Sequence, residues 1–336
     1  MKKLILSMIL CSLLLASCGS EPKSQVLETR EESTEAISSE APVDYERFGL
    51  VDQGESIGVT DAEGKEISLP KSPKRVVIGF NSYVQLWYQL GGTLVGKIKE
   101  SPDLPIPGAE DVQVIGDTKA LSEEVILSLK PDLVILSVSN DQLQTAENLR
   151  QAGIQVLTIQ VRNFEEYLRS ARIFSAIMGN ELAYETHGVQ VEAKVKEILS
   201  KVPVDKPLKA ILLNNTSKAI KISTSENTTG EMLKDLGVDN VADAFGSESD
   251  SVDFSLEQIL VEDPDFIFLR PMGSDGKKAE EIRKKLLDED PVWSSLRAVK
   301  DGHYIILDKD LYTYKPNVRY AEAYLNLAKM LYPDAY

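Results

Sequence analysis

The feature that most constrains the fold is a motif, S-x-E-x-I-L-x-x-x-P-D, that occurs twice, beginning at Ser122 and at Ser255. In both copies the pattern predicts a serine at a helix N-cap and a glutamate in the first helical turn. The proline then ends the helix before a buried strand. Self-similarity of this kind indicates structural units that repeat. The motif therefore predicts two lobes of similar construction.

Strands and helices alternate on both sides of a long helical stretch. A hairpin is predicted at 59–69, around the turn signal Ala62-Glu63-Gly64. Buried strands are then predicted at 75–80, 94–96, 133–136 and 155–159, and helices at 83–90, 123–129 and 142–152. Such alternation indicates βαβ units and mostly parallel sheets. The strand pattern is absent from Phe164 to Val202, where a helix from Glu181 to Lys201 would be about 30 Å long. A second α/β lobe begins with the strand predicted at 209–213.

The N-terminus carries an export signal. Lys2 and Lys3 precede the apolar run Leu4–Ala16, which is too short to span a bilayer. The letters L-A-S-C that end at Cys18 resemble the lipobox of bacterial lipoproteins, which implies cleavage before Cys18 and acylation of its thiol. The alternative is a chance cysteine after an ordinary secretory signal. Residues 18–50 are rich in Glu, Ser, Thr and Pro, which indicates a disordered acidic tether, or else an exposed acidic helix.

Charge and cysteine content exclude some partners and cross-links. The formal net charge is −16 at pH 7, and a diffuse acidic surface does not suit nucleic acid. Cys11 lies inside the segment expected to be removed, so Cys18 has no disulfide partner. No other apolar run reaches about eighteen residues. We therefore expect the mature chain to fold by core burial and to meet the membrane only through its lipid anchor.

Several features in a fixed order carry a family resemblance. They are the lipobox, the opening V-T-D-x-x-G, the repeated Pro-Asp, the single long helix and the closing segment with Arg319, Glu322 and Tyr332-Pro333. Together they resemble the cobalamin-, haem- and ferric-siderophore-binding proteins of ABC importers, over about residues 57–336. The resemblance implies an α/β fold with two Rossmann-like lobes, mostly parallel sheets and a single long backbone helix between the lobes. The ligand would be held between the lobes.

The expected division of the chain follows from these observations. It comprises a signal peptide (1–17), a lipidated cysteine with its tether (18–50), a first ligand-binding lobe (51–178), a connecting helix (179–202) and a second ligand-binding lobe (203–336). The resemblance further implies a monomer, anchored outside the cytoplasm on the cell membrane, with no enzymatic activity and no cofactor of its own. Its partners would be a small-molecule metal chelate and a permease dimer with its ATPase.

Glu124 and Glu257 are the equivalent glutamates of the two motif copies. A carboxylate in the first turn of a helix is favourable without any partner. In the resembled family, however, one glutamate per lobe at this position docks onto arginines of the two transmembrane subunits. The resemblance therefore implies that Glu124 and Glu257 contact the permease.

Ligands of open α/β sheets bind beyond the carboxyl ends of the strands. The loops that follow predicted strands supply the candidate ligand-binding residues, which are Asn81, Tyr83, Asp117, Thr118, Arg270, Met272, Tyr312, Tyr314, Lys315 and Arg319. The tyrosines offer flat amphipathic faces, and the cations can bind carboxylates or chelate oxygens. Each of these residues has a plainer alternative as a solvated or capping side chain, and Arg319 as a structural ion pair. The mixture suits a bulky anionic chelate.

The ligand is left open among three kinds. A ferric siderophore ranks ahead of haem or a corrinoid. Haem needs an axial ligand, for which Tyr83 and Met272 are candidates, whereas His187 and His303 read as surface or packing residues. A zinc- or manganese-binding protein of similar architecture would need several converging His and carboxylate ligands. An exported hydrolase is a weaker alternative, because the sequence contains neither G-x-S-x-G nor H-E-x-x-H.

Overall fold

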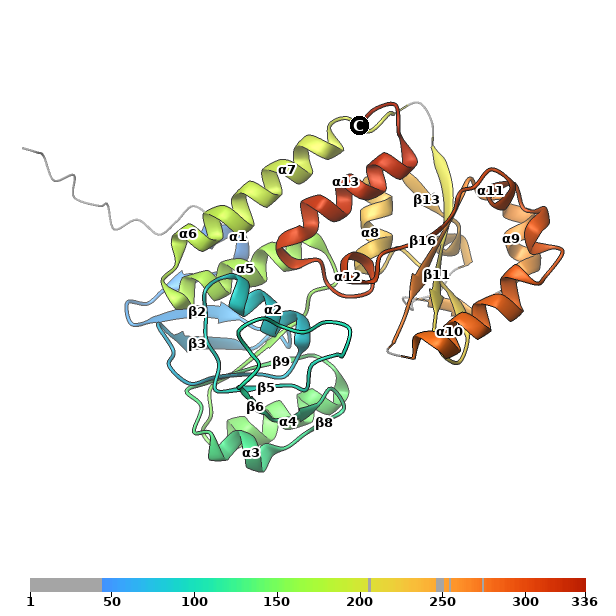
Figure 1. Ribbon diagram of the computed structural model, residues 1–336. Helices are drawn as coiled ribbons and strands as arrows, with labels where there is room; N and C mark the ends of the chain where they lie inside the picture. The colour runs from blue at the N-terminus through green and yellow to red at the C-terminus, as the bar shows by residue number, and fades with distance from the viewer. Residues whose placement is uncertain (1–43, 205–206, 246–250, 254, 274) are drawn as a thin grey trace, which may run out of the picture. The chain divides into compact units, whose positions relative to one another are not determined.

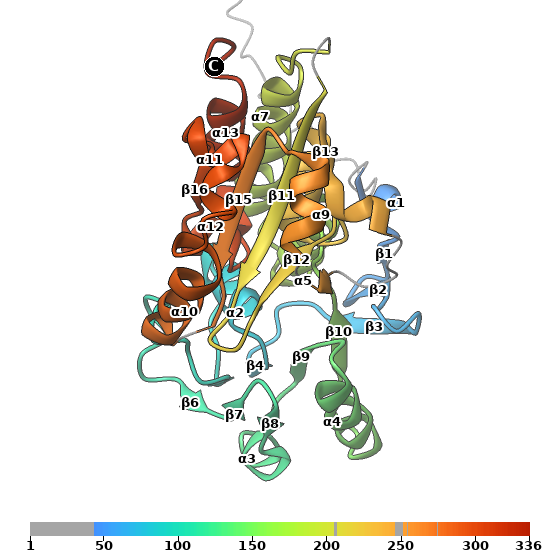
Figure 2. The ribbon, with the colours of Figure 1, turned by 90° about the vertical axis from the view of Figure 1, so that its right-hand side faces the viewer.

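The computed structural model describes residues 44–204, 207–245, 251–253, 255–273 and 275–336 (Figures 1 and 2). The predicted signal peptide, Cys18 and the tether up to residue 43 lie outside these residues. No helix within the described ranges is long and apolar enough to cross a bilayer.

A short helix, α1 (Asp44–Phe48), begins the described chain. Tyr45 and Phe48 are buried in the core. The guanidinium of Arg172 lies between the rings of Tyr45 and Tyr184, 4.6 Å from each ring centroid. The folded part therefore begins earlier than residue 51, the boundary that composition indicated, because two aromatic side chains pack here within an acidic stretch.

The first lobe contains two main sheets. The predicted hairpin is confirmed, since β2 (Ser56–Thr60) pairs antiparallel with β3 (Glu66–Pro70), and β1 (Val51–Asp52) extends this sheet. The second sheet is parallel throughout, in the order β10-β9-β4-β5-β6. Its strands are β4 (Val76–Ile78), β5 (Gly96–Lys97), β6 (Gln113–Val114), β9 (Leu133–Ser137) and β10 (Val156–Ile159). The small hairpin β7 (Gly116–Asp117) and β8 (Ala120–Leu121) follows β6.

Helices alternate with the strands of the first lobe as predicted. They are α2 (Asn81–Gln89), α3 (Glu123–Ser128), α4 (Asn140–Gln151) and α5 (Phe164–Met178). Both faces of the parallel sheet are covered, because Ile78 and Ile135 belong to one core cluster and Val77 and Val134 to another. This explains why the strands read as continuous apolar runs.

The second lobe contains one mixed sheet in the order β14-β12-β11-β15-β16, with β13 also paired to β11. Figure 2 shows β11, β12, β13, β15 and β16 of this sheet. The strands are β11 (Leu208–Asn215), β12 (Ile220–Ser223), β13 (Val238–Asn240), β14 (Ser251–Asp253), β15 (Phe266–Pro271) and β16 (Tyr304–Ile306). β13, β11, β15 and β16 run parallel, whereas β12 and β14 are antiparallel to their neighbours. The prediction of mostly parallel sheets is confirmed.

The helices of the second lobe lie between and after these strands. They are α8 (Thr228–Asp235), α9 (Leu256–Glu262), α10 (Gly276–Arg283), α11 (Arg297–Lys300), α12 (Lys309–Tyr312) and α13 (Tyr320–Leu331), with a π-helical turn at Lys284–Asp288 and 3-10 turns at Val241–Phe245, Trp293–Ser295 and Asn317–Arg319. Leu212 and Phe268 join the same core cluster as Ile78 and Ile135 of the first lobe. One apolar core is therefore shared by the two lobes.

The two copies of the motif adopt the same local structure. Ser122 caps α3 by accepting a hydrogen bond from the Val125 amide over 3.3 Å, and Ser255 caps α9 by accepting one from the Gln258 amide over 3.4 Å. The residue before each proline has a left-handed backbone, with φ of 48° at Lys130 and 41° at Asp263. The predicted serine caps are confirmed.

A single helix connects the lobes. α6 (Glu181–Tyr184), a π-helical turn (Glu185–Val189) and α7 (Gln190–Leu199) are continuous, because the junction residues keep right-handed helical angles. At 1.5 Å per residue the helix is about 28 Å long. Gly188 lies against the ring of Tyr184, where an added Cβ would approach within 2.4 Å. The apolar face of α7 packs along α13.

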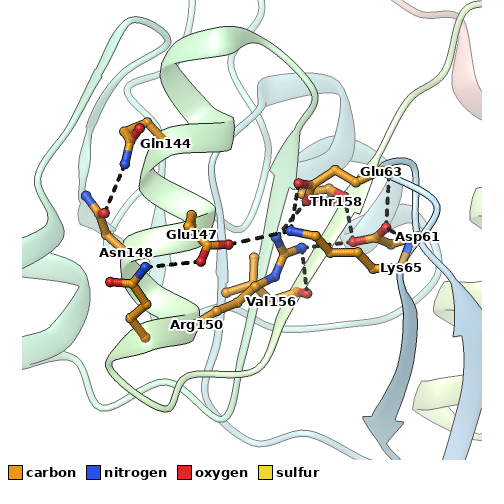
Figure 3. A network of polar contacts seen from close by, with 10 residues as sticks. Asp61, Glu63, Lys65, Gln144, Glu147, Asn148, Arg150, Val156 and Thr158 are labelled. Atoms are coloured by element: carbon orange, nitrogen blue, oxygen red, sulfur yellow. Dashed lines mark hydrogen bonds and ion pairs between the residues drawn. The ribbon is translucent and has the colours of Figure 1, made fainter.

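A polar network joins the hairpin to the parallel sheet (Figure 3). Arg150 on α4 donates to Asp61 Oδ2 over 2.8 Å and to Glu63 Oε2 over 2.7 Å. Thr158 on β10 donates to Asp61 Oδ2 over 2.9 Å. The other oxygen, Asp61 Oδ1, accepts from the Glu63 and Lys65 amides, each over 2.9 Å. The fully buried Asp61 carboxylate is thus paired and hydrogen-bonded, as a buried charge must be.

Candidate ligand-binding site

Arg270 lies at the carboxyl end of β15 and is 7% exposed. Its Nε donates to Asn214 Oδ1 over 2.9 Å. Its Nη1 donates to Asn227 Oδ1 over 3.1 Å and to the Tyr312 carbonyl over 3.3 Å. These neutral oxygens come from three separate segments of the second lobe. They fix the orientation of the guanidinium at the edge of the sheet.

Lys315 places a second cation near Arg270. Its Nζ donates to Thr228 Oγ1 over 2.8 Å. Burial lowers the pKa of Lys315 to about 8, and the charge of Arg270 contributes to this shift, while Glu166 and Glu231 act in the opposite direction. Lys315 makes no ion pair within the part of the chain that the structure describes. An anion placed here would favour the protonated form of Lys315.

The first turn of α8 connects the two cations. Asn227 caps this helix by accepting from the Gly230 amide over 3.2 Å, and the same oxygen accepts from Arg270. Thr228, the first residue of α8, accepts from Lys315. The N-terminal end of a helix favours negative charge. The helix N-terminus and the two cations therefore all contribute a positive electrostatic potential at this end of α8.

Glu231, one turn further along α8, has the opposite charge when ionised. Its Oε2 accepts from the backbone amide of Phe164, the first residue of α5, over 3.0 Å. Burial raises the pKa of Glu231 to about 7, and Asp235 and Glu166 add to the shift. The carboxyl group is thus partly protonated near neutral pH, which reduces the negative charge beside Lys315.

The residues around α12 also contact the first lobe. The hydroxyl of Tyr314 and the hydroxyl of Ser101 share a hydrogen bond of 2.8 Å. Lys309 forms an ion pair with Asp103 and donates to the Gly273 carbonyl over 2.6 Å. The loop after β5 in the first lobe is therefore held against the carboxyl edge of the second-lobe sheet. This is the edge at which Arg270 lies.

Tyr83 and Tyr312, two of the predicted ligand-binding residues, are packed into the core. They are 4% and 2% exposed. The Tyr83 hydroxyl donates to the Ile159 carbonyl over 3.2 Å, and the Tyr312 hydroxyl donates to the Ala323 carbonyl over 2.9 Å. Both rings are thus held by the fold itself. Tyr314 is the partly exposed tyrosine of the predicted set.

The remaining candidates divide between the strand ends and the surface. Asn81 begins α2 and donates weakly to the Lys99 carbonyl over 3.4 Å, while its Oδ1 is buried without a partner among the described residues. Met272 follows Arg270 and is partly exposed. Asp117 and Thr118 are exposed in the β7–β8 turn, where Asp117 Oδ1 accepts from the Lys119 amide over 3.0 Å.

Arg319 has a structural partner of its own. It forms a two-bond ion pair with Glu322, with both distances 2.7 Å. The pair lines a surface groove together with α7 residues such as Lys194 and Glu197. The structure thus gives Arg319 the ion pair that the sequence offered as its alternative role.

Glu124 and Glu257 are both exposed in the first turns of α3 and α9. Neither carboxylate has an ion pair or a side-chain hydrogen bond within the described ranges. Glu123, by contrast, accepts from Asn148 over 2.8 Å and belongs to the packing of α3 on α4. The motif glutamates are therefore not needed to hold their helices in place.

The histidines have local roles. The ring of His303 stacks on Phe266, with centroids 4.3 Å apart, and its Nδ1 lies 3.0 Å from the Asp265 carbonyl. His187 lies in the π-helical turn of the connecting helix, and burial lowers its pKa. In the described ranges no group of three or more His, Cys, Asp or Glu side chains could hold a metal ion.

Comparison with known proteins identifies the family. A model of the periplasmic binding protein family matches residues 76–311, which is more than half of the chain. The chain belongs to this family. The region matched runs from the first parallel strand to α12 and so includes both lobes.

Two curated relatives of this periplasmic binding protein align with most of its sequence. It is 26% identical over 344 residues to the uncharacterized ABC transporter substrate-binding lipoprotein YvrC of Bacillus subtilis, covering 98% of this chain and 96% of YvrC. It is 25% identical to the Fe(3+)-citrate-binding protein YfmC of the same organism, covering 79% of this chain and 82% of YfmC. The predicted family is confirmed: the protein is a substrate-binding protein of an ABC transporter and not an enzyme.

Solved structures share the fold of this periplasmic binding protein. Staphylococcus aureus IsdE, solved with heme, has a TM-score of 0.66 and 20% identity over 77% of this chain and 98% of IsdE. S. aureus SirA, solved with staphyloferrin B, has a TM-score of 0.64 and 21% identity over 82% of this chain and 97% of SirA. The predicted fold class is confirmed.

Sequence reasoning missed the contacts that bring the lobes together in this periplasmic binding protein. Ser101 and Asp103 follow the strand predicted at 94–96, and Lys309 precedes the predicted Tyr312. The rule that ligands bind beyond strand ends covered these loops, but only Tyr314 of the four contacting residues was chosen. Thr228 was missed because the polar stretch after β12, residues 224–229, contains four hydroxyl residues that the sequence does not distinguish.

Proposed function

We propose that this protein is a lipid-anchored receptor outside the cytoplasm that captures an anionic ferric chelate, of the carboxylate-bearing type, and delivers it to an ABC permease. The observation that carries the proposal is the ammonium group of Lys315, held near Arg270 with a lowered pKa and no ion pair among the described residues. Burial and the neighbouring guanidinium both disfavour the ammonium form of Lys315, and a bound anion would favour it.

The named ligands of relatives support this class of chelate. YfmC is named as an Fe(3+)-citrate-binding protein, and FecB of Escherichia coli, 25% identical, as an Fe(3+) dicitrate-binding protein. A carboxylate-rich chelate offers oxygen acceptors to the Arg270 guanidinium, with bonds that are roughly twice as strong as those between neutral groups. Tyr314 and Met272, both partly exposed nearby, would contact its apolar surface. Tyr83 and Tyr312 would support the site from below rather than touch the ligand.

A binding panel tests the proposal. Ferric citrate, a carboxylate siderophore loaded with iron, ferrioxamine, haemin and cyanocobalamin are titrated into the mature protein by calorimetry and by thermal shift. We expect the carboxylate chelates to bind. Lys315→Gln should lower their affinity about tenfold, which corresponds to a loss of about 1.4 kcal/mol in binding free energy. Trp87 and Trp293 are each 2% exposed, so fluorescence quenching would report energy transfer to the iron chelate and not ring contact.

Lys309→Gln and Lys65→Gln serve as matched controls. Lys309 is a cation of the same region that already has an acidic partner, and Lys65 lies in the hairpin network. The proposed ligand class would be contradicted if ferrioxamine or cyanocobalamin bound as tightly as the carboxylate chelates. It would also be contradicted if Lys315→Gln bound the carboxylate chelates as tightly as the wild type does. Selective binding of haemin would instead favour haem as the ligand.

Delivery to the permease is assigned to Glu124 and Glu257. Both are exposed, both lack partners within the described ranges, and each stands at the same position of its lobe. A permease with two equivalent transmembrane subunits would bind such a pair through basic residues, and charge complementarity sets the rate and orientation of encounter.

The anchor is assigned to Cys18. The relatives YvrC and YhfQ of Bacillus subtilis are named as lipoproteins, and the sequence around Cys18 has the form of a lipobox. Two acyl chains on one residue suffice for stable attachment, whereas one chain gives marginal binding. Cys18→Ala is expected to abolish palmitate labelling and to leave the protein unprocessed or released. Labelling of the variant at the wild-type level would refute the assignment.

A further inference from the structure

The two copies of the motif can be compared position by position, and the fold accounts for most of their identities. The serines cap α3 and α9, and Ile126 and Ile259 are fully buried. The Pro-Asp pairs join each helix to the next strand. These residues are the same in both lobes because each lobe needs them to fold.

Two identities are left that no side-chain contact within the described lobes explains. One is the glutamate at Glu124 and Glu257. The other is a leucine, at Leu127 and Leu260, which is 41% and 38% exposed. Both belong to the small set of large apolar residues that are exposed among the described residues. An apolar side chain that recurs at an exposed position gains nothing from the folded lobe alone.

The glutamate and the leucine lie on the same face of each helix. Leu127 is three residues after Glu124, and Leu260 is three residues after Glu257. Residues three apart are neighbours on a helix surface, about 5–6 Å between Cβ atoms. Each lobe therefore presents a carboxylate with an apolar group directly beside it, and we call these two side chains the Glu-Leu pair.

The positions between the shared residues differ where they face the lobe. Glu123 bonds to Asn148 of α4, whereas its counterpart Leu256 packs against the second-lobe core. The two helices thus meet different interiors. Their outer faces nevertheless carry the same pair of side chains, which indicates that the outer faces meet the same kind of surface.

We propose that Leu127 and Leu260 are the apolar half of the permease contact, each inserting into a hydrophobic depression beside the basic group that receives the neighbouring glutamate. This inference rests on the proposed docking function of Glu124 and Glu257. The partner is a pair of equivalent transmembrane subunits, because the chain has one Glu-Leu pair in each lobe. The charged residues govern encounter, and the leucines govern how long the complex lasts.

The separate roles of the glutamates and the leucines can be measured in binding kinetics. The permease with its ATPase is reconstituted in lipid nanodiscs, and the ligand-free mature protein is passed over it. Leu127→Ala with Leu260→Ala should raise the dissociation rate about tenfold and leave the association rate within about twofold, as expected when apolar area is lost from an interface. Glu124→Gln with Glu257→Gln should mainly slow association and remove its salt dependence.

Leu286→Ala provides the matched control. Leu286 is 39% exposed, close to the exposure of the two motif leucines, and lies in the second lobe outside the repeat. It should leave both rates unchanged. Melting temperature and chelate affinity should be unaffected by the leucine substitutions, because neither side chain contributes to the described core.

The outcomes separate the inference from the proposed function. If the glutamate variant docks poorly while the leucine variant dissociates at the wild-type rate, the leucines have no role and docking by the glutamates stands. If neither variant changes docking, both ideas are overturned. An equal effect of Leu286→Ala would reduce the leucine effect to general surface hydrophobicity and would also overturn the inference.

Discussion

Asp132 and Asp265 make the same contact in the two lobes. Asp132 accepts hydrogen bonds from the backbone amides of Lys74 and Arg75, over 2.7 and 3.0 Å, at the start of β4. Asp265 accepts one from the Lys209 amide over 2.8 Å at the start of β11. In each lobe the aspartate of the motif thus fixes the neighbouring parallel strand in register with its own.

Removing either aspartate should destabilise its lobe. Asp132→Ala and Asp265→Ala each leave strand amides without their acceptor, which should lower the free energy of unfolding by about 2 kcal/mol. Asp132→Asn should cost less, since the amide side chain keeps one acceptor oxygen. Urea unfolding at pH 7 measures the change. A loss below the error of the measurement for both alanine variants would show that solvent replaces the contact.

The Asp265 contact also predicts a pH dependence. Burial alone would raise the pKa of Asp265, but the Lys209 amide and the Arg297 guanidinium outweigh it and hold the pKa below its ordinary value. The stabilisation is therefore present above about pH 4 and is lost as pH falls through the depressed pKa of the folded state. Acid unfolding of Asp265→Asn should lack this component, whereas a wild-type acid profile in that variant would contradict the assignment.

Arg150 should matter more for stability than its partly exposed position suggests. Arg150→Met leaves the fully buried Asp61 carboxylate without its guanidinium, and breaking a buried pair on one side costs about 3–5 kcal/mol. Arg150→Met combined with Asp61→Asn should recover part of the loss. Thermal unfolding of the single and double variants forms a double-mutant cycle. Additive losses would show that the two side chains are not coupled.

Lys315 should couple chelate binding to pH. Its pKa of about 8 lies below the ordinary value, so the folded protein disfavours the ammonium, and this penalty is complete below pH 8 and fades as pH rises toward 10.5. An anionic chelate reverses the preference, so binding should take up a proton above pH 8 and weaken as pH rises. Lys315→Met should stabilise the ligand-free protein at pH 7 and flatten the pH profile of affinity. Calorimetry in buffers of different ionisation enthalpy detects the proton, and its absence would exclude Lys315 from the site.

The contacts between the lobes should slow ligand exchange. Tyr314→Phe removes the bond to Ser101, and Asp103→Asn weakens the ion pair with Lys309. Together they should raise the association and dissociation rates of the chelate severalfold while changing its affinity little. Stopped-flow measurements give both rates. Glu197→Gln, which breaks the surface pair between Glu197 on α7 and Lys201, is the control. Equal rates in the double variant and the wild type would contradict this role.

Glu124→Gln with Glu257→Gln should leave chelate affinity and melting temperature nearly unchanged while uptake by cells collapses. Both side chains are exposed and without partners in the described ranges, so the loss of their charge removes only a small interaction with the helix dipole. Reversal of both to Arg should be worse, through repulsion from basic residues on the permease. Normal uptake by the Gln variant, or loss of chelate binding in solution, would refute the docking role.

Elements with strong local signals were predictable from the sequence. The hairpin at β2–β3 followed from apolar residues around Ala62-Glu63-Gly64, and the serine caps of α3 and α9 followed from the motif. The site was harder, because a residue after a strand can point outward or into the core. Tyr83 and Tyr312 lie on helices that begin within three residues of a strand end, and each buries its ring. Only long-range packing decides such cases.

The contact of Arg270 with Asn214, Asn227 and the Tyr312 carbonyl shows the same limit. These groups are 40 or more residues from Arg270 in the chain. No periodicity or turn signal relates positions so far apart, although the end of a buried strand did mark Arg270 as a candidate. Likewise, α1 was assigned to the tether because its acidic residues dominate the local composition.

The π-helical turn at Glu185–Val189 has a consequence for how such proteins can diverge. A turn of this kind holds one more residue than an α-helical turn, and each residue rotates a helix by about 100°. Because the extra residue is taken up within one turn, the residues that follow face the same way as they would in a regular helix. Deleting one residue here would therefore restore a regular helix and leave Val191, Val195 and Ile198 facing α13. A related chain with a connector one residue shorter could keep its apolar stripe where it is.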